Sequence, residues 1–228
     1  MRNKRKLSSL YRTTNKHKLN LKKEEIREEI KVLRNENLSD KGVADRKSRR
    51  ITAKLRSIIL KLNPKRVFFY IPIKHEVNIL ELVSALPDSI DIFIPHYSTE
   101  RNLWMITQLD KNIKIKEFVK IKNNIPQQET CKKLFNNLID AQFTEEDIAI
   151  VPGLGFDRNG CRIGYGEGNY DRYLKQFTGI KIGVAFDFQM VDYIPSEKHD
   201  IPVDLILTER ASYIVENSQH YSKIFAKL

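Results

Sequence analysis

The sequence predicts an α/β fold with a mostly parallel central sheet. Short apolar runs typical of buried strands recur along the chain, at residues 67–71, 148–151, 180–186 and 203–208. Amphipathic helical patterns lie before and between these runs, and strands that alternate with helices are typical of parallel sheets. The chain has 228 residues, of which 41% are hydrophobic, which is enough for one large domain.

The positive charge of the chain is concentrated at its N-terminus. Residues 1–23 carry nine Lys or Arg and no Asp or Glu; subtracting nine from the formal net charge of +11 leaves +2 for residues 24–228. We therefore interpret residues 1–21 as a flexible basic arm and residues 22–228 as a single α/β domain. The arm is expected to be a solvated tail, with contact to nucleic acid or an anionic surface, or organelle targeting, as the alternatives.

Several classes of protein are disfavoured by composition. No apolar run approaches the roughly 18–20 residues that span a bilayer, and the N-terminus lacks the apolar segment of a secretory signal. Cys131 and Cys161 do not form a CxxC pair, which argues against a zinc site and fits a reducing compartment. We expect a cytoplasmic monomer with small-molecule partners and no membrane partner.

The first helix is predicted from Lys22 to about Asn35. An apolar stripe (Ile26, Ile30, Leu33) is flanked by a basic stripe (Lys23, Arg27, Lys31, Arg34). Like charges four residues apart repel each other, so the basic stripe suggests an anion opposite it. A solvated charged helix is the alternative, and the pattern by itself favours that alternative.

A second helix is predicted to begin after Ser39 or Asp40 as N-cap and to end at Asn63-Pro64. The strand at 67–71 follows it. Glu76 lies just past the carboxyl end of this strand, where open α/β sheets bind ligands. Without other information, Glu76 would be an ordinary carboxylate at a helix start.

The remaining elements are expected as follows. A helix covers about 78–85, strands cover 90–95 and 103–106, and a short helix lies within 129–146. After residue 175 come the strand at 180–186, a loop at 194–200 and the last strand at 203–208.

The stretch from Asp147 to Leu174 carries the strongest signal for function. After the strand at 148–151, Asp157–Gly160 predicts a tight turn, and Asn169 is the expected N-cap of a helix to about Lys175. Between them, the alternating glycines 164, 166 and 168 allow backbone N–H groups to approach an anion closely. Arg162 and a carboxylate in the first helical turn, Asp171, then predict a phosphate site with a metal; a glycine-rich packing turn is the alternative.

Two familiar nucleotide motifs do not fit this loop. A dinucleotide fingerprint has the spacing Gly-x-Gly-x-x-Gly, whereas this loop reads Gly-x-Gly-x-Gly. A P-loop requires Gly-Lys-Ser/Thr, and no Lys follows any of these glycines.

The 23 residues PGLGFDRNGCRIGYGEGNYDRYL, 152–174, closely resemble the signature of the 5-formyltetrahydrofolate cyclo-ligase family. Further segments resemble the family in the same order: the helix with Lys23 and Arg27, IPIKHEVN, IFIPHY, NNIPQQ and IGVAFDFQ…IPSEKHDIPVDLILTE. Together they span roughly Lys22 to Glu209. The resemblance implies a three-layer α/β fold with helices on both faces of the sheet.

The resemblance also implies roles for particular residues. For ATP they are Lys23, Arg27, Arg162, Ile163, Gly164, Tyr165, Gly166, Glu167, Gly168, Asn169 and Tyr170. For the folate substrate they are Ile71, Glu76, Tyr165, Gly166, Glu167, Gly168 and Asn169. For Mg²⁺ they are Asp171 and Asp200; no residue is implied as a nucleophile.

The implied reaction is the ATP- and Mg²⁺-dependent cyclisation of 5-formyltetrahydrofolate to 5,10-methenyltetrahydrofolate, with release of ADP and phosphate. The chain departs from the family pattern at two places. Asn169 stands where the family usually has Tyr, and Glu167 stands where many members have Gly or Lys. We expect activity to survive, because the Mg²⁺ carboxylates and the Lys23/Arg27 pair are present.

Two other functions stay open at this point. The first is a nucleic-acid-binding protein that uses the basic arm, with an α/β domain that is inactive or specific for another phosphate ligand. The second is a phosphate-binding α/β enzyme of another kind, such as a sugar-phosphate isomerase, which would need no ATP.

Overall fold

A computed structural model describes residues 2–73, 75–98, 103–109, 144–166 and 169–228. The helices are α1 (Arg2–Asn37), α2 (Lys41–Leu62), α3 (Leu82–Ala85), α6 (Asn169–Leu174), the 3-10 turn η1 (Asp187–Gln189) and α7 (Tyr221–Phe225). The strands are β1 (Arg66–Phe68), β2 (Asp91–Ser98), β3 (Leu103–Gln108), β4 (Ile148–Pro152), β5 (Gly155–Phe156), β6 (Arg162–Ile163), β7 (Ile180–Val184), β8 (Leu205–Leu207) and β9 (Ser212–Ile214). The NNIPQQ segment, most of the predicted helix within 129–146, Glu167 and Gly168 lie outside the described residues.

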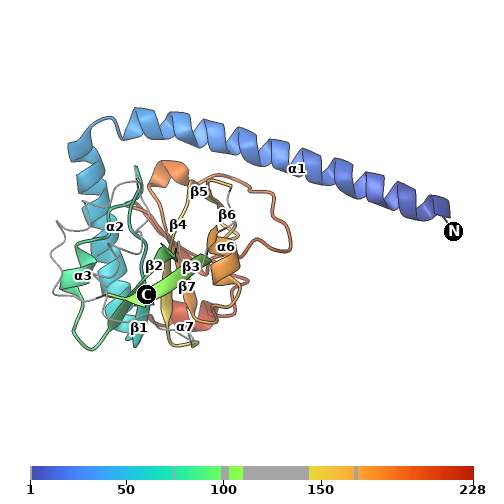
Figure 1. Cartoon of the computed structure of the whole chain (residues 1–228). Coiled ribbons are helices and arrows are strands. Elements are labelled where there is room, and N and C mark those ends of the chain that lie inside the picture. Colours follow the sequence, from blue (N-terminus) through green and yellow to red (C-terminus); the bar gives the residue numbers. More distant parts are fainter. Residues whose placement is uncertain (1, 74, 99–102, 110–143, 167–168) are drawn as a thin grey trace.

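A seven-stranded sheet, in the order β3-β2-β1-β4-β7-β8-β9, forms the centre of the molecule (Figure 1). The five inner strands are parallel, and β3 and β9 are antiparallel at the two edges. This confirms the predicted mostly parallel sheet. From β1 the chain order runs outward to β2, and from β4 it runs outward the other way to β7. The order therefore reverses between β1 and β4, which is the usual position of a ligand site in such sheets.

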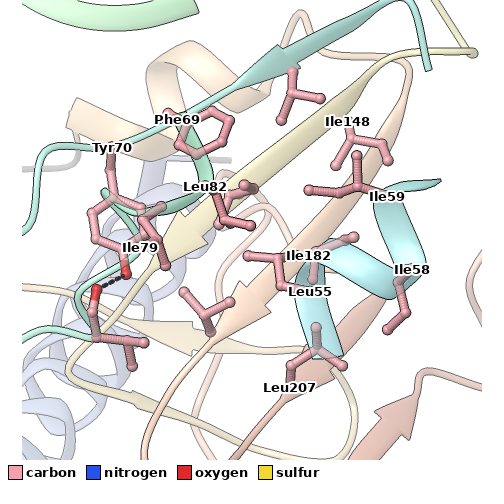
Figure 2. Close-up of a cluster of buried hydrophobic side chains, with 14 of the residues drawn as sticks. Leu55, Ile58, Ile59, Phe69, Tyr70, Ile79, Leu82, Ile148, Ile182 and Leu207 are labelled. Carbon is pink, nitrogen blue, oxygen red and sulfur yellow. Dashed lines mark hydrogen bonds between the residues drawn. The ribbon is translucent and has the colours of Figure 1, made fainter. Parts of the chain in front are cut away.

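Alternate residues of the central strand β4 pack against opposite faces of the sheet. Ile148 and Ile150 join a cluster that includes Leu55 and Ile59 of α2 and Leu82 of α3, part of which is drawn in Figure 2. Ala149 and Val151 join a second cluster, with Leu174 of α6 and Phe177. Because a strand directs successive side chains to opposite faces, the fully buried β4 is covered on both sides. The three-layer prediction is confirmed.

The predicted ends of α2 agree with the structure. The Asp40 side chain accepts hydrogen bonds from the amides of Gly42 (2.7 Å) and Val43 (3.3 Å), as an N-cap does. Asn63 ends the helix in the left-handed conformation, with φ of 48°.

Helix α1 differs from the expectation at its beginning. We predicted a flexible arm to residue 21 and a helix from Lys22, but one helix runs from Arg2 to Asn37, roughly 54 Å at 1.5 Å per residue. Its N-terminal part extends away from the rest of the molecule (Figure 1). Residues 2–21 contain neither Gly nor Pro, so no residue in this segment breaks the helix.

The segment after β1 also differs from the expectation. The strand ends at Phe68 rather than residue 71, and the helix predicted for 78–85 covers only Leu82–Ala85. Side chains of α2 account for the late start of α3: Ser48 accepts from the Asn78 amide at 3.2 Å, and Thr52 donates to the Asn78 carbonyl at 3.1 Å. With both backbone groups of Asn78 engaged in this way, the helix begins later.

Among the residues that the structure describes, no helix is both long and apolar enough to cross a membrane.

Candidate functional site

The candidate site lies where the carboxyl ends of β1 and β4 meet. Glu76 belongs to the loop that follows β1, and Gly153 directly follows β4. The two strands are paired in parallel, so these two segments leave the sheet at the same edge. An open crevice at this edge is the expected place for a ligand in a doubly wound sheet.

A small hairpin, β5–β6, brings Arg162 to this edge. The turn between its strands is the predicted one: the Gly160 amide donates to the Asp157 carbonyl at 3.1 Å, and Gly160 has φ of +81°. The Asp157 carboxylate is fully buried and accepts from the amides of Asn159, Cys161 and Ile194. These bonds fix the hairpin against the loop that leads to Asp200.

Helix α1 packs over the hairpin and supplies the cations of the site. Ile30 is fully buried, and a Cβ placed on Gly155 would collide with its Cδ1. The helix can therefore approach the hairpin closely only because residue 155 has no side chain. Lys23, Arg27 and Arg34, which lie on the same side of the helix as Ile30, all contact the body of the molecule.

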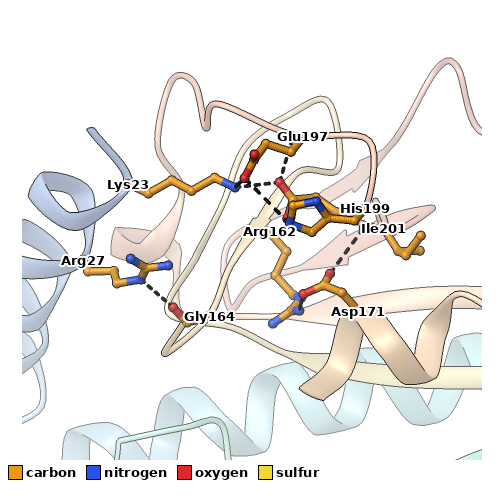
Figure 3. A network of polar contacts seen from close by, with 9 residues as sticks. Lys23, Arg27, Arg162, Gly164, Asp171, Glu197, His199 and Ile201 are labelled. Atoms are coloured by element: carbon orange, nitrogen blue, oxygen red, sulfur yellow. Dashed lines mark hydrogen bonds and ion pairs between the residues drawn. The ribbon is translucent and has the colours of Figure 1, made fainter. Parts of the chain in front are cut away.

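Lys23 is paired with a predicted metal carboxylate. Its Nζ lies 2.7 Å from Asp200 Oδ2 and 3.6 Å from Glu197 Oε2 (Figure 3). Partial burial acts to raise the pKa of Asp200, but the hydrogen bonds from Lys23 and from the Glu197 amide outweigh it, so the pKa is lowered. Asp200 is thus held in its ionised form.

Arg162 is paired with the other predicted metal carboxylate. Its Nη2 donates to Asp171 Oδ2 at 2.9 Å, and the opposite oxygen of Asp171 accepts from the Ile201 amide at 3.3 Å. Since Ile201 directly follows Asp200, this hydrogen bond joins α6 to the loop that carries Asp200; Figure 3 shows Asp171 and Ile201.

These two carboxylates fit a Mg²⁺ ion that binds together with phosphate. In the described part of the chain, no group of three or more His, Cys, Asp or Glu could hold a metal by itself. Mg²⁺ typically takes one or two carboxylates and completes its shell with phosphate oxygens and water. The two carboxylates of Asp171 and Asp200 match this coordination preference. Lys23 and Arg162 lie beside them.

The glycine loop lies under Arg27. Arg27 Nε donates to the Gly164 carbonyl at 2.9 Å, and its Nη1 contacts Glu24 on its own helix at 2.7 Å. Gly166 has φ of +105°, a conformation that favours glycine. Tyr165, between the two glycines, is half exposed. Ile163 is buried before the loop and α6 begins at Asn169.

Glu76 is a partly buried carboxylate in the loop that follows β1. Its carboxylate accepts from the Ile73 amide at 3.0 Å. Burial raises the pKa of Glu76 to about 7, although the Ile73 hydrogen bond and the positive charges of Arg34 and Arg162 act to lower it. A buried carboxyl group whose pKa is raised in this way is typical of a functional site.

Two further predicted residues, Ile71 and Tyr170, pack against the apolar clusters of the sheet. Ile71 packs against the cluster below α2. Tyr170 packs against both apolar clusters, with the Arg162 guanidinium 5.5 Å from its ring centre. Burial and the nearby charge of Glu76 raise the pKa of the Tyr170 hydroxyl, which places this residue close to Glu76.

One residue of this region was not predicted to have a site role. Arg34 is 3% exposed, and its Nη2 donates to the Gly153 carbonyl at 2.8 Å while Nη1 donates to the Tyr165 hydroxyl at 2.9 Å. The available signal was the basic stripe, in which Arg34 continues the spacing of Lys23 and Arg27. Lys31, also in the stripe, is instead exposed and pairs with Glu28.

Taken together, the fold and the site define a doubly wound α/β protein whose switch point carries paired cations and carboxylates. The sequence pattern of the 5-formyltetrahydrofolate cyclo-ligase family matches residues 20–209. The chain belongs to this family. The family is one of ligases, so the prediction that the chain is an enzyme is confirmed.

Individual relatives agree with this membership. A 5-formyltetrahydrofolate cyclo-ligase from Mus musculus is 31% identical over 154 residues, covering 64% of this chain and 74% of the mouse protein. The Escherichia coli K12 protein of the same name is 40% identical over 65 residues, 27% of this chain and 36% of that protein. The Aquifex aeolicus 5,10-methenyltetrahydrofolate synthetase structure has a TM-score of 0.64 at 26% identity, covering 86% of this chain and 94% of that chain.

Proposed function

We propose that this protein catalyses the ATP- and Mg²⁺-dependent cyclisation of 5-formyltetrahydrofolate to 5,10-methenyltetrahydrofolate, with release of ADP and phosphate. The observation that carries the proposal is the meeting, at one edge of the sheet, of Lys23 and Arg27 from α1, the glycine loop, and the Asp171/Asp200 carboxylates, with Glu76 beside them. The names of the relatives support the choice of substrate.

The chemistry explains why a nucleotide is needed. A formamide carbonyl is a poor electrophile and its oxygen is a poor leaving group. Transfer of the γ-phosphoryl group to the formyl oxygen makes that oxygen a good leaving group, and N10 of the same folate then closes the ring as phosphate departs. The main tasks of the protein in such a reaction are to position the two substrates and to stabilise the charge of the phosphates.

The residues divide between the two ends of the site. Lys23, Arg27, Arg162 and the backbone of residues 163–170 would hold the phosphates, and Asp171 and Asp200 would hold Mg²⁺, which neutralises phosphate charge when bound. Ile71, Glu76 and the loop at 165–169 would hold the folate. These loop residues include Glu167, Gly168 and the side chain of Asn169, which are not among the parts of the chain that the structure describes.

The direct test is an assay of the purified protein with 5-formyltetrahydrofolate, Mg²⁺ and ATP, followed by the near-ultraviolet absorbance of methenyltetrahydrofolate. Product should form only with ATP. Asp171→Asn should lower kcat/KM by about 100-fold or more, because it removes charge from the metal pair. Asp192→Asn, an exposed carboxylate near the same loop, is the matched control and should keep full activity. An ATP-independent signal, or an active Asp171→Asn, would contradict the proposal.

We further propose that residues 1–21 are an extension to the catalytic domain. The family match begins at residue 20, which supports this division. Deleting residues 2–21 should leave turnover unchanged. If the rival function is correct, the full chain should instead bind RNA with an affinity that falls steeply with salt, and the deletion should abolish this binding.

A further inference from the structure

Arg34 is a buried cation whose hydrogen bonding is incomplete. Only its Nη1 and Nη2 atoms have partners, and both partners are neutral: the Tyr165 hydroxyl and the Gly153 carbonyl. Its buried Nε–H has no hydrogen-bond partner among the described residues. No ion pair within the described chain joins Arg34 to a carboxylate at contact distance.

This arrangement is costly unless something else compensates for it. A buried guanidinium stays charged, and both the charge and the unpaired N–H lose hydration on burial. The positive charge of Arg34 acts to lower the pKa of the Glu76 carboxyl and that of the buried Tyr70 hydroxyl, and Glu76 is the carboxylate of the two. A ligand that lies between Arg34 and Glu76 could satisfy both of them.

The position of Arg34 assigns it to the folate end of the site. It contacts the residue that follows β4, whereas Glu76 follows the neighbouring strand β1. Along α1, Arg34 lies seven residues beyond Arg27 and eleven beyond Lys23, which is roughly 10 Å and 16 Å of helix. The Lys23 end of the helix contacts Asp200, so Arg34 lies at the opposite end of the proposed site.

We propose that Arg34 determines specificity for the folate ring by donating its Nε–H to the 4-oxo oxygen of the pterin. The pyrimidinone edge of a pterin presents one acceptor, the 4-oxo oxygen, beside two donors, N3–H and the 2-amino group. A guanidinium N–H next to a carboxylate presents the complementary pattern, with Glu76 accepting from the two donors. This assignment rests on the proposed function, and extends it from the kind of substrate to the ring edge that is recognised.

A purely structural role is the alternative to be excluded. Arg34 also fastens α1 to Gly153 and orients Tyr165, and either contact could explain why an Arg is needed. A structural role would weaken all ligands alike, whereas recognition of the 4-oxo group would act on one ligand only. The test therefore compares ligands rather than activities.

The experiment measures the Kd of 5-formyltetrahydrofolate, of its 4-amino-4-deoxy analogue and of ATP with Mg²⁺ by calorimetry. The unmodified protein should bind the 4-oxo ligand more tightly than the 4-amino ligand, which presents a donor in place of the acceptor. Arg34→Gln and Arg34→Lys should weaken 4-oxo binding by roughly 10- to 100-fold, the worth of a hydrogen bond to a charged group. Both variants should reduce the ratio of the Kd values of the 4-amino and 4-oxo ligands. The Kd of ATP should stay unchanged. Lys31→Gln, whose side chain pairs with Glu28 of the same helix, is the matched control and should change nothing.

Each other outcome overturns the assignment in a distinct way. If the Arg34 variants bind both pteridines and ATP more weakly by the same factor, Arg34 only holds α1 against the segment that follows β4. Unchanged Kd values in a folded Arg34→Gln would show that it makes no contact. Equal affinity of the unmodified protein for the two ligands would reject the assignment even if both variants fail to fold. If the unmodified protein binds ATP but neither pteridine, the proposed function itself is wrong.

Discussion

At the scale of single residues, the site is defined by charges that the protein has to balance internally. Lys23 neutralises Asp200 and Arg162 neutralises Asp171, at 2.7 and 2.9 Å. Among the residues that the structure describes, Glu76 has no cation at ion-pair distance, and burial raises its pKa to about 7. A carboxyl group of this kind changes its charge near neutral pH, so it should have a measurable effect on stability.

The first prediction concerns Glu76 and pH. Its pKa in the folded protein, about 7, is above the ordinary value of 4.5, so between these values the folded state binds a proton that the unfolded state does not. The free energy of unfolding should therefore fall as pH rises from about 4.5 to about 7, by up to about 3 kcal/mol from this group. The amide side chain in the Glu76→Gln variant cannot ionise, so the free energy of unfolding of this variant should not show this decrease with pH.

Denaturant unfolding at pH 5 and at pH 8 measures the effect. The free energy of unfolding of Glu76→Gln, relative to that of the unmodified protein, should increase from pH 5 to pH 8. Glu76→Gln should also bind 5-formyltetrahydrofolate more weakly than the unmodified protein does. Glu81→Gln, an exposed carboxylate further along the same segment, serves as the control. A stability difference that does not depend on pH would contradict the perturbed pKa.

At the scale of elements, the docking of α1 decides whether a site exists. The helix contributes Lys23, Arg27 and Arg34, and it reaches the body through the contact of Ile30 with Gly155. The hairpin β5–β6 is in turn fixed by the buried Asp157 carboxylate. A change far from the ligand, at the helix–hairpin contact, should therefore alter the site.

The second prediction tests this contact. A Cβ at residue 155 would collide with Ile30 Cδ1 and lie 3.2 Å from the Gln189 carbonyl, so Gly155→Ala should reduce stability by about 1–3 kcal/mol and weaken ATP binding. Ile30→Val removes the Cδ1 atom and should cost about 0.5–1.5 kcal/mol alone. Because the two residues touch, the double variant should lose less stability than the sum of the single losses.

Denaturant unfolding of the four proteins of this double-mutant cycle gives the coupling energy. Val32→Ala, on the exposed side of α1, is the control for helix substitutions and should have a small effect. Additive losses in the cycle would show that Ile30 and Gly155 are not in close contact.

At the scale of the whole molecule, ion pairs join the elements that surround the site. Two of the three cations proposed to hold phosphate, Lys23 and Arg162, are bound to the carboxylates proposed to hold Mg²⁺, and these pairs join α1 to the loop at 194–200 and β6 to α6. Nucleotide and metal would have to exchange these partners together. Such an exchange couples the two binding events.

The third prediction follows from this exchange. Lys23→Gln removes the cation that competes for Asp200, so it should increase the affinity for Mg²⁺ measured without nucleotide by several-fold. The same change should decrease the affinity for ATP in the presence of Mg²⁺, because a phosphate contact is lost. Calorimetric titration measures both constants, and Lys22→Gln, the exposed neighbour, is the control. A parallel decrease of both affinities would reject the exchange.

The sequence by itself determined the family, the α/β class and most of the strand positions. The strand segments are continuous apolar runs in which polar and apolar residues do not alternate. Strands of this kind are buried on both faces of a sheet, which is typical of parallel sheets. The turn at Asp157–Gly160 and the cap at Asp40 depend on local chemistry, so they could be predicted from a few residues. The resemblance to the family supplied the roles proposed for Lys23 and Asp200, which local pattern could not assign, whereas the position of Asp171 in the first turn of a helix already indicated a metal ligand.

Only the tertiary structure decided how these residues pair. Asn78 looked like the start of a helix, but side chains of α2, distant in sequence, engage its backbone. The flexible arm expected at residues 1–21 is continuous with α1, because nothing in the segment breaks a helix. Arg34 looked like one more cation on a solvated face, yet burial under the loop after β4 gives it contacts that no spacing rule reveals. Burial and charge partners depend on segments more than 100 residues apart, and only the folded chain brings those segments together.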